Sequence, residues 1–169
     1  MKAKMSPLKN FGIDVNKSNF GEIAIYSLAR AYALIEREIS EYLRPFNLTP
    51  AKFNAMMVIK HQGKEKGLSQ IAVGRQLIVT ASNMTRLLDK LDKEGFIERL
   101  PQGADRRINL IRISKKGSKL LDQVWPGYSK KVNELAEILG ANNTKKISRL
   151  LLSWCAKLES NSKNRKAYA

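Results

Sequence analysis

The 169-residue chain carries 31 lysine and arginine residues against 15 aspartate and glutamate residues, a formal net charge of +16. Such a charge favours a polyanionic partner, either nucleic acid or an anionic membrane surface, but no run of residues is long and apolar enough to span a membrane. The single cysteine, Cys155, excludes an intramolecular disulfide framework, and we expect a cytoplasmic location. With one histidine, His61, and no glycine-rich phosphate loop, we expect no metal, no cofactor and no enzymatic activity.

Two helices are predicted in the first third of the chain. Between residues 18 and 43, apolar residues recur at roughly helical spacing. This helix ends near Arg44-Pro45, because a residue that precedes proline avoids the helical ψ angle. A second helix then begins at Pro50, with Thr49 as its N-cap.

A helix-turn-helix and a hairpin follow. Ser69 and Thr80 are good N-caps for two closely spaced helices, and Gly95 is the C-terminal stop of the second. Two β-prone runs, near 96–100 and 109–113, flank a tip with two adjacent arginines. This order predicts a winged helix-turn-helix, whose second helix enters the major groove of DNA while the hairpin reaches toward the minor groove.

The helix after Thr80 has two distinct faces. Its N-terminal half, TASNMTR (residues 80–86), carries on the exposed face hydroxyl, amide and guanidinium groups of the kinds that bind base edges and phosphates. A merely solvated polar face is the alternative for this helix taken alone. The opposite face is an apolar stripe that we expect to lie against a core, made of Met84, Leu87, Leu88 and Leu91.

The last third of the chain predicts two further helices. Ser114 caps a long helix that Pro126 and Gly127 can kink. Residues 142–144 open a last helix that runs to about Glu159. The tail beyond it is basic and polar, and we expect it to fray.

The stretch LSQIAVGRQLIVTASNMTRLLDKLDKEGFIERLPQGADRRINLIRISKKG resembles the core of MarR-type transcriptional regulators. Within it, TRLLDKLDKEGFIER is similar to the family's recognition helix as it runs into the first wing strand, and ADRRINLIRISKKG is similar to the wing. Upstream, FNLTPAKFNAMMVI resembles the helix that precedes the helix-turn-helix. Two positions depart from the pattern, because Gly74 lies where alanine is usual and Ile78 lies where a turn glycine is common.

The resemblance implies a mainly α fold with a small two- or three-stranded β-wing, a winged helix-turn-helix whose terminal helices form a dimerisation region. Apolar residues of those outer helices are also explained by a core within one chain, which is the plainer alternative. The implied organisation is a flexible basic arm at 1–17, a domain at 18–160 with its winged-helix lobe at about 49–113 and dimerisation helices at about 18–44 and 114–160, and a basic tail at 161–169.

Carried over by position, the resemblance implies roles for the side chains of the recognition helix and the wing. A solubilising hairpin tip is the alternative for the two wing arginines. In the implied set, Ala81, Ser82, Thr85 and Arg86 face the major groove beside Lys90, Thr80 and Asn83 position phosphate or the helix start, Arg106 and Arg107 probe the minor groove, and Asp105 stiffens the wing.

The resemblance also implies a small anionic or phenolic effector, and in some members a cysteine that senses oxidants. Cys155 lies in an apolar stretch of the last helix, so we expect a buried, inert thiol. A methionine and aromatic stripe at helical spacing is more typical of a core than of a pocket. The residues that could line an effector pocket are Tyr26, Arg30, Phe53, Met57 and His61.

We therefore expect a sequence-specific transcriptional regulator, a homodimeric repressor that binds a near-palindromic operator in double-stranded DNA and is released by a small effector. A largely non-specific or architectural DNA-binding protein is the first alternative. From Leu68 to Lys116 there are 10 basic and 5 acidic residues, so only +5 of the +16 lies in the recognition elements. A winged helix that binds protein instead of DNA is the second alternative, against which the lysine-rich polar face argues.

Overall fold

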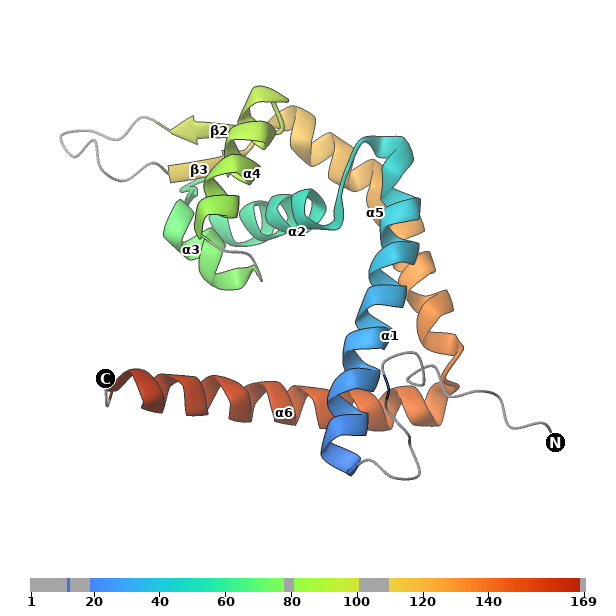
Figure 1. The fold of residues 1–169 in the computed structure, drawn as a ribbon. Coiled ribbons are helices and arrows are strands. Elements are labelled where there is room, and N and C mark those ends of the chain that lie inside the picture. The colour runs from blue at the N-terminus through green and yellow to red at the C-terminus, as the bar shows by residue number, and fades with distance from the viewer. Residues whose placement is uncertain (1–11, 13–18, 78–80, 101–109, 168–169) are drawn as a thin grey trace. The chain divides into compact units, whose positions relative to one another are not determined.

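The computed structural model describes residue 12 and residues 19–77, 81–100 and 110–167 (Figure 1). These residues form six α-helices and three short strands, which confirms the expected mainly α fold with a small β-wing. The chain divides into two compact units, Met1–Tyr128 and Ser129–Ala169. No helix in the described part of the chain is long and apolar enough to cross a membrane.

The first helix, α1, spans Phe20–Leu43. Its N-cap is Asn19, whose side-chain oxygen accepts a hydrogen bond from the amide of Glu22 at 2.8 Å and so satisfies one of the free donors of the first turn. Helix α1 ends just before Arg44-Pro45, as predicted. Pro45 lies in the short 3-10 turn that follows, η2 (Arg44–Phe46).

The second helix, α2, spans Pro50–Val58 and has the predicted cap. The hydroxyl of Thr49 accepts a hydrogen bond from the amide of Lys52 at 3.3 Å, and proline occupies the first helical position, where no amide hydrogen is needed. A π-helical turn, η3 (Ile59–Gly63), completes the segment.

The helix-turn-helix consists of α3 (Gln70–Gln76) and α4 (Ala81–Lys93). Ser69 caps α3 as predicted, since its hydroxyl accepts a hydrogen bond from the amide of Ala72 at 3.2 Å. The predicted cap of α4, Thr80, lies outside the described residues. In Figure 1 the two helices lie beside α2 and the strands.

Gly95 terminates α4, as the sequence predicted. Gly95 adopts a φ of +75°, which a residue with a side chain rarely adopts. Its amide donates to the carbonyl of Asp92 at 2.8 Å, and the amide of Phe96 donates to the carbonyl of Leu91 at 2.9 Å. This pair of bonds is a Schellman motif, and it turns the chain directly from α4 into the wing.

A three-stranded antiparallel sheet forms the described part of the wing. It contains β1 (Leu68–Ser69), β2 (Ile97–Leu100) and β3 (Leu110–Ile113), in the order β1-β3-β2. Figure 1 shows β2 and β3 side by side. Leu100, the last residue of β2, pairs with Leu110, the first residue of β3. The short β1 precedes α3, so the sheet ties the start of the helix-turn-helix to the wing.

The core of the first unit forms where α2, α3 and α4 pack together. The predicted apolar stripe of α4 is confirmed for Met84, Leu88 and Leu91, which are buried, while Leu87 is half-buried. Each large apolar side chain that is fully buried stabilises the fold by roughly 1.5–3 kcal/mol. The other large side chains that are fully buried are Leu43, Phe53, Met56, Ile59, Val73, Ile97, Ile111, Leu121 and Val124.

Helix α5 spans Lys115–Glu137 and starts at the predicted cap. The hydroxyl of Ser114 accepts a hydrogen bond from the amide of Gly117 at 2.9 Å and donates one to the carbonyl of Gly95 at 2.7 Å. One serine therefore joins the start of α5 to the end of α4.

A tyrosine from α1 stabilises α5 beside the proline at its centre. The hydroxyl of Tyr42 donates a hydrogen bond to the carbonyl of Val124 at 2.8 Å. A Cβ atom at Gly127 would clash with the same hydroxyl oxygen, so a larger residue there would require the Tyr42 side chain to shift. Pro126 cannot donate a backbone hydrogen bond, and the contact with Tyr42 supplies a tertiary bond at this point of the helix.

Helix α6, which spans Ala141–Ala167, corrects two expectations. The helix does not end near Glu159, because the following residues include neither glycine nor proline and continue with lysine, arginine and alanine, which propagate a helix. Cys155 is exposed and is not the buried thiol that its apolar neighbours suggested. Those neighbours are themselves exposed, as Leu150 and Leu158 are.

Candidate nucleic-acid interface

The exposed face of α4 carries the polar residues that the sequence assigned to DNA. Asn83, Thr85, Arg86 and Lys90 all have exposed side chains. Arg86 lies opposite the buried stripe and the other three lie at its flanks, so the packing of α4 against the core fixes the direction in which they point.

The two aspartates of α4 share one ion-pair partner, an arginine from the wing, which offsets part of their negative charge. Arg99 of β2 forms an ion pair with Asp89 and a second one with Asp92, with 3.1 Å between Nε and Oδ2. Exposed ion pairs of this kind stabilise a fold little, but here they remove negative charge from the helix surface. The basic side chains on α4 that form no ion pair within the described residues are Arg86, Lys90 and Lys93.

A hydrogen bond joins the two helices of the helix-turn-helix on their exposed side. The side-chain amide of Gln70, at the start of α3, donates to the hydroxyl oxygen of Thr85 in α4 at 2.9 Å. The hydroxyl hydrogen of Thr85 and the amide oxygen of Gln70 then stay available as a donor and an acceptor. The sequence did not assign Gln70 to the site, because its partner is 15 residues away on another helix.

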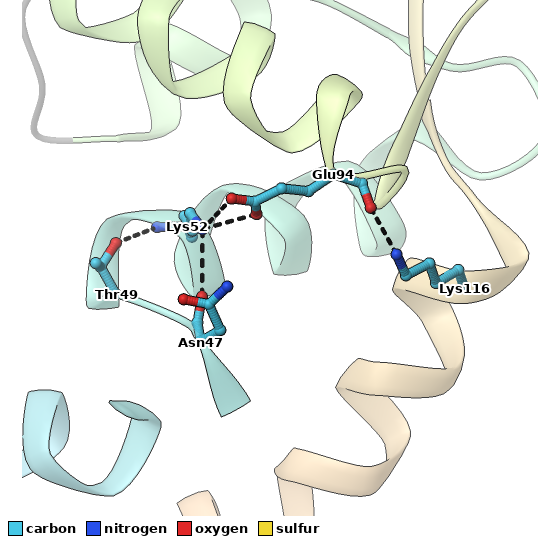
Figure 2. A network of polar contacts seen from close by, with 5 residues as sticks. All are labelled: Asn47, Thr49, Lys52, Glu94 and Lys116. Carbon is cyan, nitrogen blue, oxygen red and sulfur yellow. Dashed lines mark hydrogen bonds and ion pairs between the residues drawn. The ribbon is translucent and has the colours of Figure 1, made fainter. Parts of the chain in front are cut away.

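A buried lysine anchors the C-terminal end of α4 (Figure 2). The side chain of Lys52 is 4% exposed, and its ammonium group binds both carboxylate oxygens of Glu94, at 2.7 and 2.8 Å. It also donates to the carbonyl of Asn47 at 3.2 Å, and Lys116 donates to the backbone carbonyl of Glu94 at 2.8 Å. Three segments that are distant in sequence thus meet at the residue where the recognition helix ends. The sequence analysis missed Lys52, since a lysine in an amphipathic helix normally marks a solvated face.

The wing strands are braced by ion pairs on their exposed side. Glu98 and Arg112 lie opposite each other in the β2–β3 register and are joined by an ion pair of 3.0 Å. Opposite charges at directly facing positions stabilise a strand pair. The wing tip, with Asp105, Arg106 and Arg107, lies outside the described residues.

Comparison with known proteins gives the same fold and a family to which part of the chain is similar. Residues 46–108, which begin in η2 before α2, match the model of the MarR family. The HTH-type transcriptional regulator MhqR of Bacillus subtilis is 25% identical over 124 residues, which cover 73% of this chain and 83% of that protein. The chain is therefore similar to the MarR family of transcriptional regulators over its helix-turn-helix and wing.

Other members of the MarR family match shorter stretches of sequence but most of the fold. The multiple antibiotic resistance protein MarR of Escherichia coli is 30% identical over 88 residues, 52% of this chain and 59% of that protein. A mutant of the same MarR, solved in complex with operator DNA, has a TM-score of 0.70 at 24% identity and covers 80% of this chain and 98% of that chain. The MepR–DNA complex of S. aureus has a TM-score of 0.71 at 16% identity, covering 83% and 99%.

The predicted DNA-binding residues fall into two groups. The first group lies on α4. Ala81 and Ser82 are in the first turn of this helix, and the residues with exposed side chains that follow are Asn83, Thr85, Arg86 and Lys90. Thr80 and the residues of the wing tip, Arg106, Arg107 and Asp105, lie outside the described residues.

The residues expected to line an effector pocket are only partly accessible. Phe53 is 1% exposed, and its ring centroid lies 4.4 Å from that of Tyr128, so Phe53 packs as a core residue. Burial raises the pKa of Tyr128 above its usual value. Met57 is half-buried, whereas Tyr26, Arg30 and His61 are exposed.

Proposed function

We propose that this chain is a sequence-specific, homodimeric repressor of the MarR family that acts in the cytoplasm on a near-palindromic operator. The observation that supports the proposal most directly is the charge distribution on α4. Its aspartates are paired with Arg99, while Arg86 and Lys90 form no ion pair in the described part of the chain. Such a face attracts phosphates and leaves an arginine able to bind a guanine edge with both of its terminal nitrogens.

The residues of α4 and the wing would make different kinds of contact with DNA. Phosphate contacts fix the position of a protein on the duplex, and base contacts provide specificity. Thr85 would act together with Gln70, since the hydrogen bond between them fixes the orientation of both side chains. In this proposal Ala81, Ser82, Thr85, Arg86 and Lys90 face the major groove, Thr80 and Asn83 hold phosphate or the helix start, Arg106 and Arg107 enter the minor groove, and Asp105 stiffens the wing.

The first and last helices would supply the dimer interface. Both expose large apolar side chains, including Phe20 at 90% and Tyr32 at 60% on α1, and Leu150 at 70% and Leu152 at 73% on α6. Apolar exposure on this scale is typical of an interaction surface. A two-fold dimer would present two recognition helices about 34–36 Å apart, one turn of DNA, which explains the expectation of a near-palindrome.

A small anionic or phenolic effector would release the repressor from DNA. Tyr26, Arg30, Met57 and His61 remain candidates for its pocket, whereas Phe53 is part of the core. The effector need only bind one of the two conformations of the dimer more tightly than the other to shift the equilibrium.

A largely non-specific DNA-binding protein is the second candidate, and the net charge of +16 favours it. The two candidates differ in salt dependence and in sequence discrimination. Strong affinity for every sequence, with a steep loss as salt rises, would support the second candidate.

Arg86→Ala tests the base-reading role of α4. We expect a loss of roughly 1–3 kcal/mol in binding free energy on the preferred operator, with little change on scrambled DNA, measured by titration at one salt concentration. Lys93→Ala is the matched control, since it removes one positive charge from the opposite end of the same exposed face. An equal loss on both DNAs from Arg86→Ala would reassign this arginine to phosphate.

A further inference from the structure

A cavity of about 640 Å³ lies at the base of the wing, away from the proposed reading face. It is formed by the end of η3, the start of β2, the end of β3 and the first turn of α5. Five of the ten residues that line it are basic and two are acidic, which leaves a charge of +3. The basic residues are Lys60, Lys64, Arg112, Lys115 and Lys116.

The two acidic residues of this cavity share one arginine as their ion-pair partner. Arg112 pairs with Glu98 at 3.0 Å and lies 3.8 Å from Glu65, so one arginine serves both carboxylates. Lys60 pairs with Asp122, which is not among the lining residues. The excess positive charge of the cavity therefore comes from the remaining lysines.

The remaining lysines are held together without a counter-ion. Lys116 donates to a backbone carbonyl, that of Glu94, and its ammonium group lies 4.9 Å from the ring centroid of Phe96. Lys64 and Lys115 form no ion pair with any described residue. A concave surface with like charges concentrates positive potential, and a bound anion would relieve the repulsion between them.

The backbone at Lys64 supports a binding role. Its φ of 42° with ψ of −138° lies in a region that favours glycine. Strained backbone of this kind persists where surrounding structure holds it, and it gathers at binding sites. Lys64, which has this strained conformation, lines the cavity.

The size and place of the cavity indicate a small molecule. Its volume falls within the range of roughly 300–1,000 Å³ that is typical of small-molecule sites. The cavity contacts Gly95, just after α4 ends, and shares no residue with the proposed base contacts, although Lys90 lies within one turn of that end.

We propose that this cavity binds a small molecule with two or more anionic groups, such as linked phosphates. Lys64, Lys115 and Lys116 provide charge-assisted hydrogen bonds to the anionic oxygens. The residues that line the site include none of the proposed DNA contacts and none of the residues suggested for a phenolic effector pocket. It also contacts both the wing and the end of the recognition helix, so an occupant would act directly on the elements that meet DNA.

Calorimetric titration of the full chain with inorganic tripolyphosphate, without DNA and at about physiological salt, tests the proposal. We expect saturable binding by the wild type and a loss of about tenfold or more in the double variant Lys64→Ala/Lys115→Ala. The matched control is Lys146→Ala/Lys157→Ala, which removes two exposed positive charges from α6 and should weaken binding less than about twofold. No binding by the wild type, or equal weakening in both double variants, would overturn the proposal.

A second titration separates a small anion from the phosphates of DNA. Both double variants should bind scrambled duplex equally well. A greater loss for Lys64→Ala/Lys115→Ala would mean that the cavity holds the DNA backbone, and the small-molecule site would be abandoned. Because the tripolyphosphate titration contains no DNA, its result does not depend on whether the chain recognises an operator.

Discussion

Replacing Glu94 by alanine should lower the free energy of unfolding by about 3–5 kcal/mol. The change leaves the ammonium group of Lys52, whose side chain is 4% exposed, with the carbonyl of Asn47 as its remaining bond in the described structure. A buried charge that loses its counter-ion is far costlier than the loss of an exposed pair. Urea unfolding followed by circular dichroism measures the effect.

The double variant Lys52→Met/Glu94→Ala is the decisive control. It removes both charges and leaves an apolar side chain of similar volume, so it should be more stable than Glu94→Ala alone by about 2 kcal/mol or more. The rescue keeps the test informative even if Glu94→Ala does not fold. A double variant no more stable than Glu94→Ala would contradict the structural role of the pair.

Gly117→Ala should destabilise the protein by about 3 kcal/mol. A Cβ atom there would lie 2.1 Å from the carbonyl oxygen of Phe96 and 2.9 Å from Cδ1 of Ile113. The carbonyl belongs to the backbone, so α5 would have to move away from the wing. That movement would strain the hydrogen bond of 3.0 Å from the Ser114 amide to the same carbonyl.

Gly74→Ala is the matched substitution, and we expect it to increase the stability of the protein. A Cβ atom at this position in α3 would lie 3.9 Å from Cε of Met84, an ordinary van der Waals contact. Alanine should therefore stabilise the helix by about 0.5–1 kcal/mol. Thermal unfolding of the two variants side by side gives the comparison. Equal midpoints would show that α5 does not pack against Phe96 as described.

Features that depend on neighbouring residues were accessible from the sequence. The caps at Thr49, Ser69 and Ser114 each use a side-chain oxygen three residues before its donor. The stop at Gly95 and the apolar stripe of α4 follow from backbone freedom and helical periodicity. These signals, with the resemblance to the MarR family, were enough to predict the winged helix and the exposed polar residues of its second helix.

Features that depend on distant partners were not accessible. Lys52 and Glu94 are 42 residues apart, and nothing near either one indicates that the lysine is buried. The pairing of Arg99 with the aspartates of α4 likewise depends on how the wing folds back. The exposure of Cys155 was missed for a related reason. Apolar neighbours predict burial only if a partner covers them, and that partner need not be in the same chain.

Selection from a pool of random duplexes at about physiological salt, followed by titration of the winners against scrambled DNA, tests the central claim most directly. The account predicts a near-palindromic winner whose half-sites lie one helical turn apart, bound about 10³-fold or more above scrambled sequence. Absence of an enriched motif, with micromolar binding that collapses as salt rises, would contradict sequence-specific recognition by α4 and favour a non-specific DNA-binding protein.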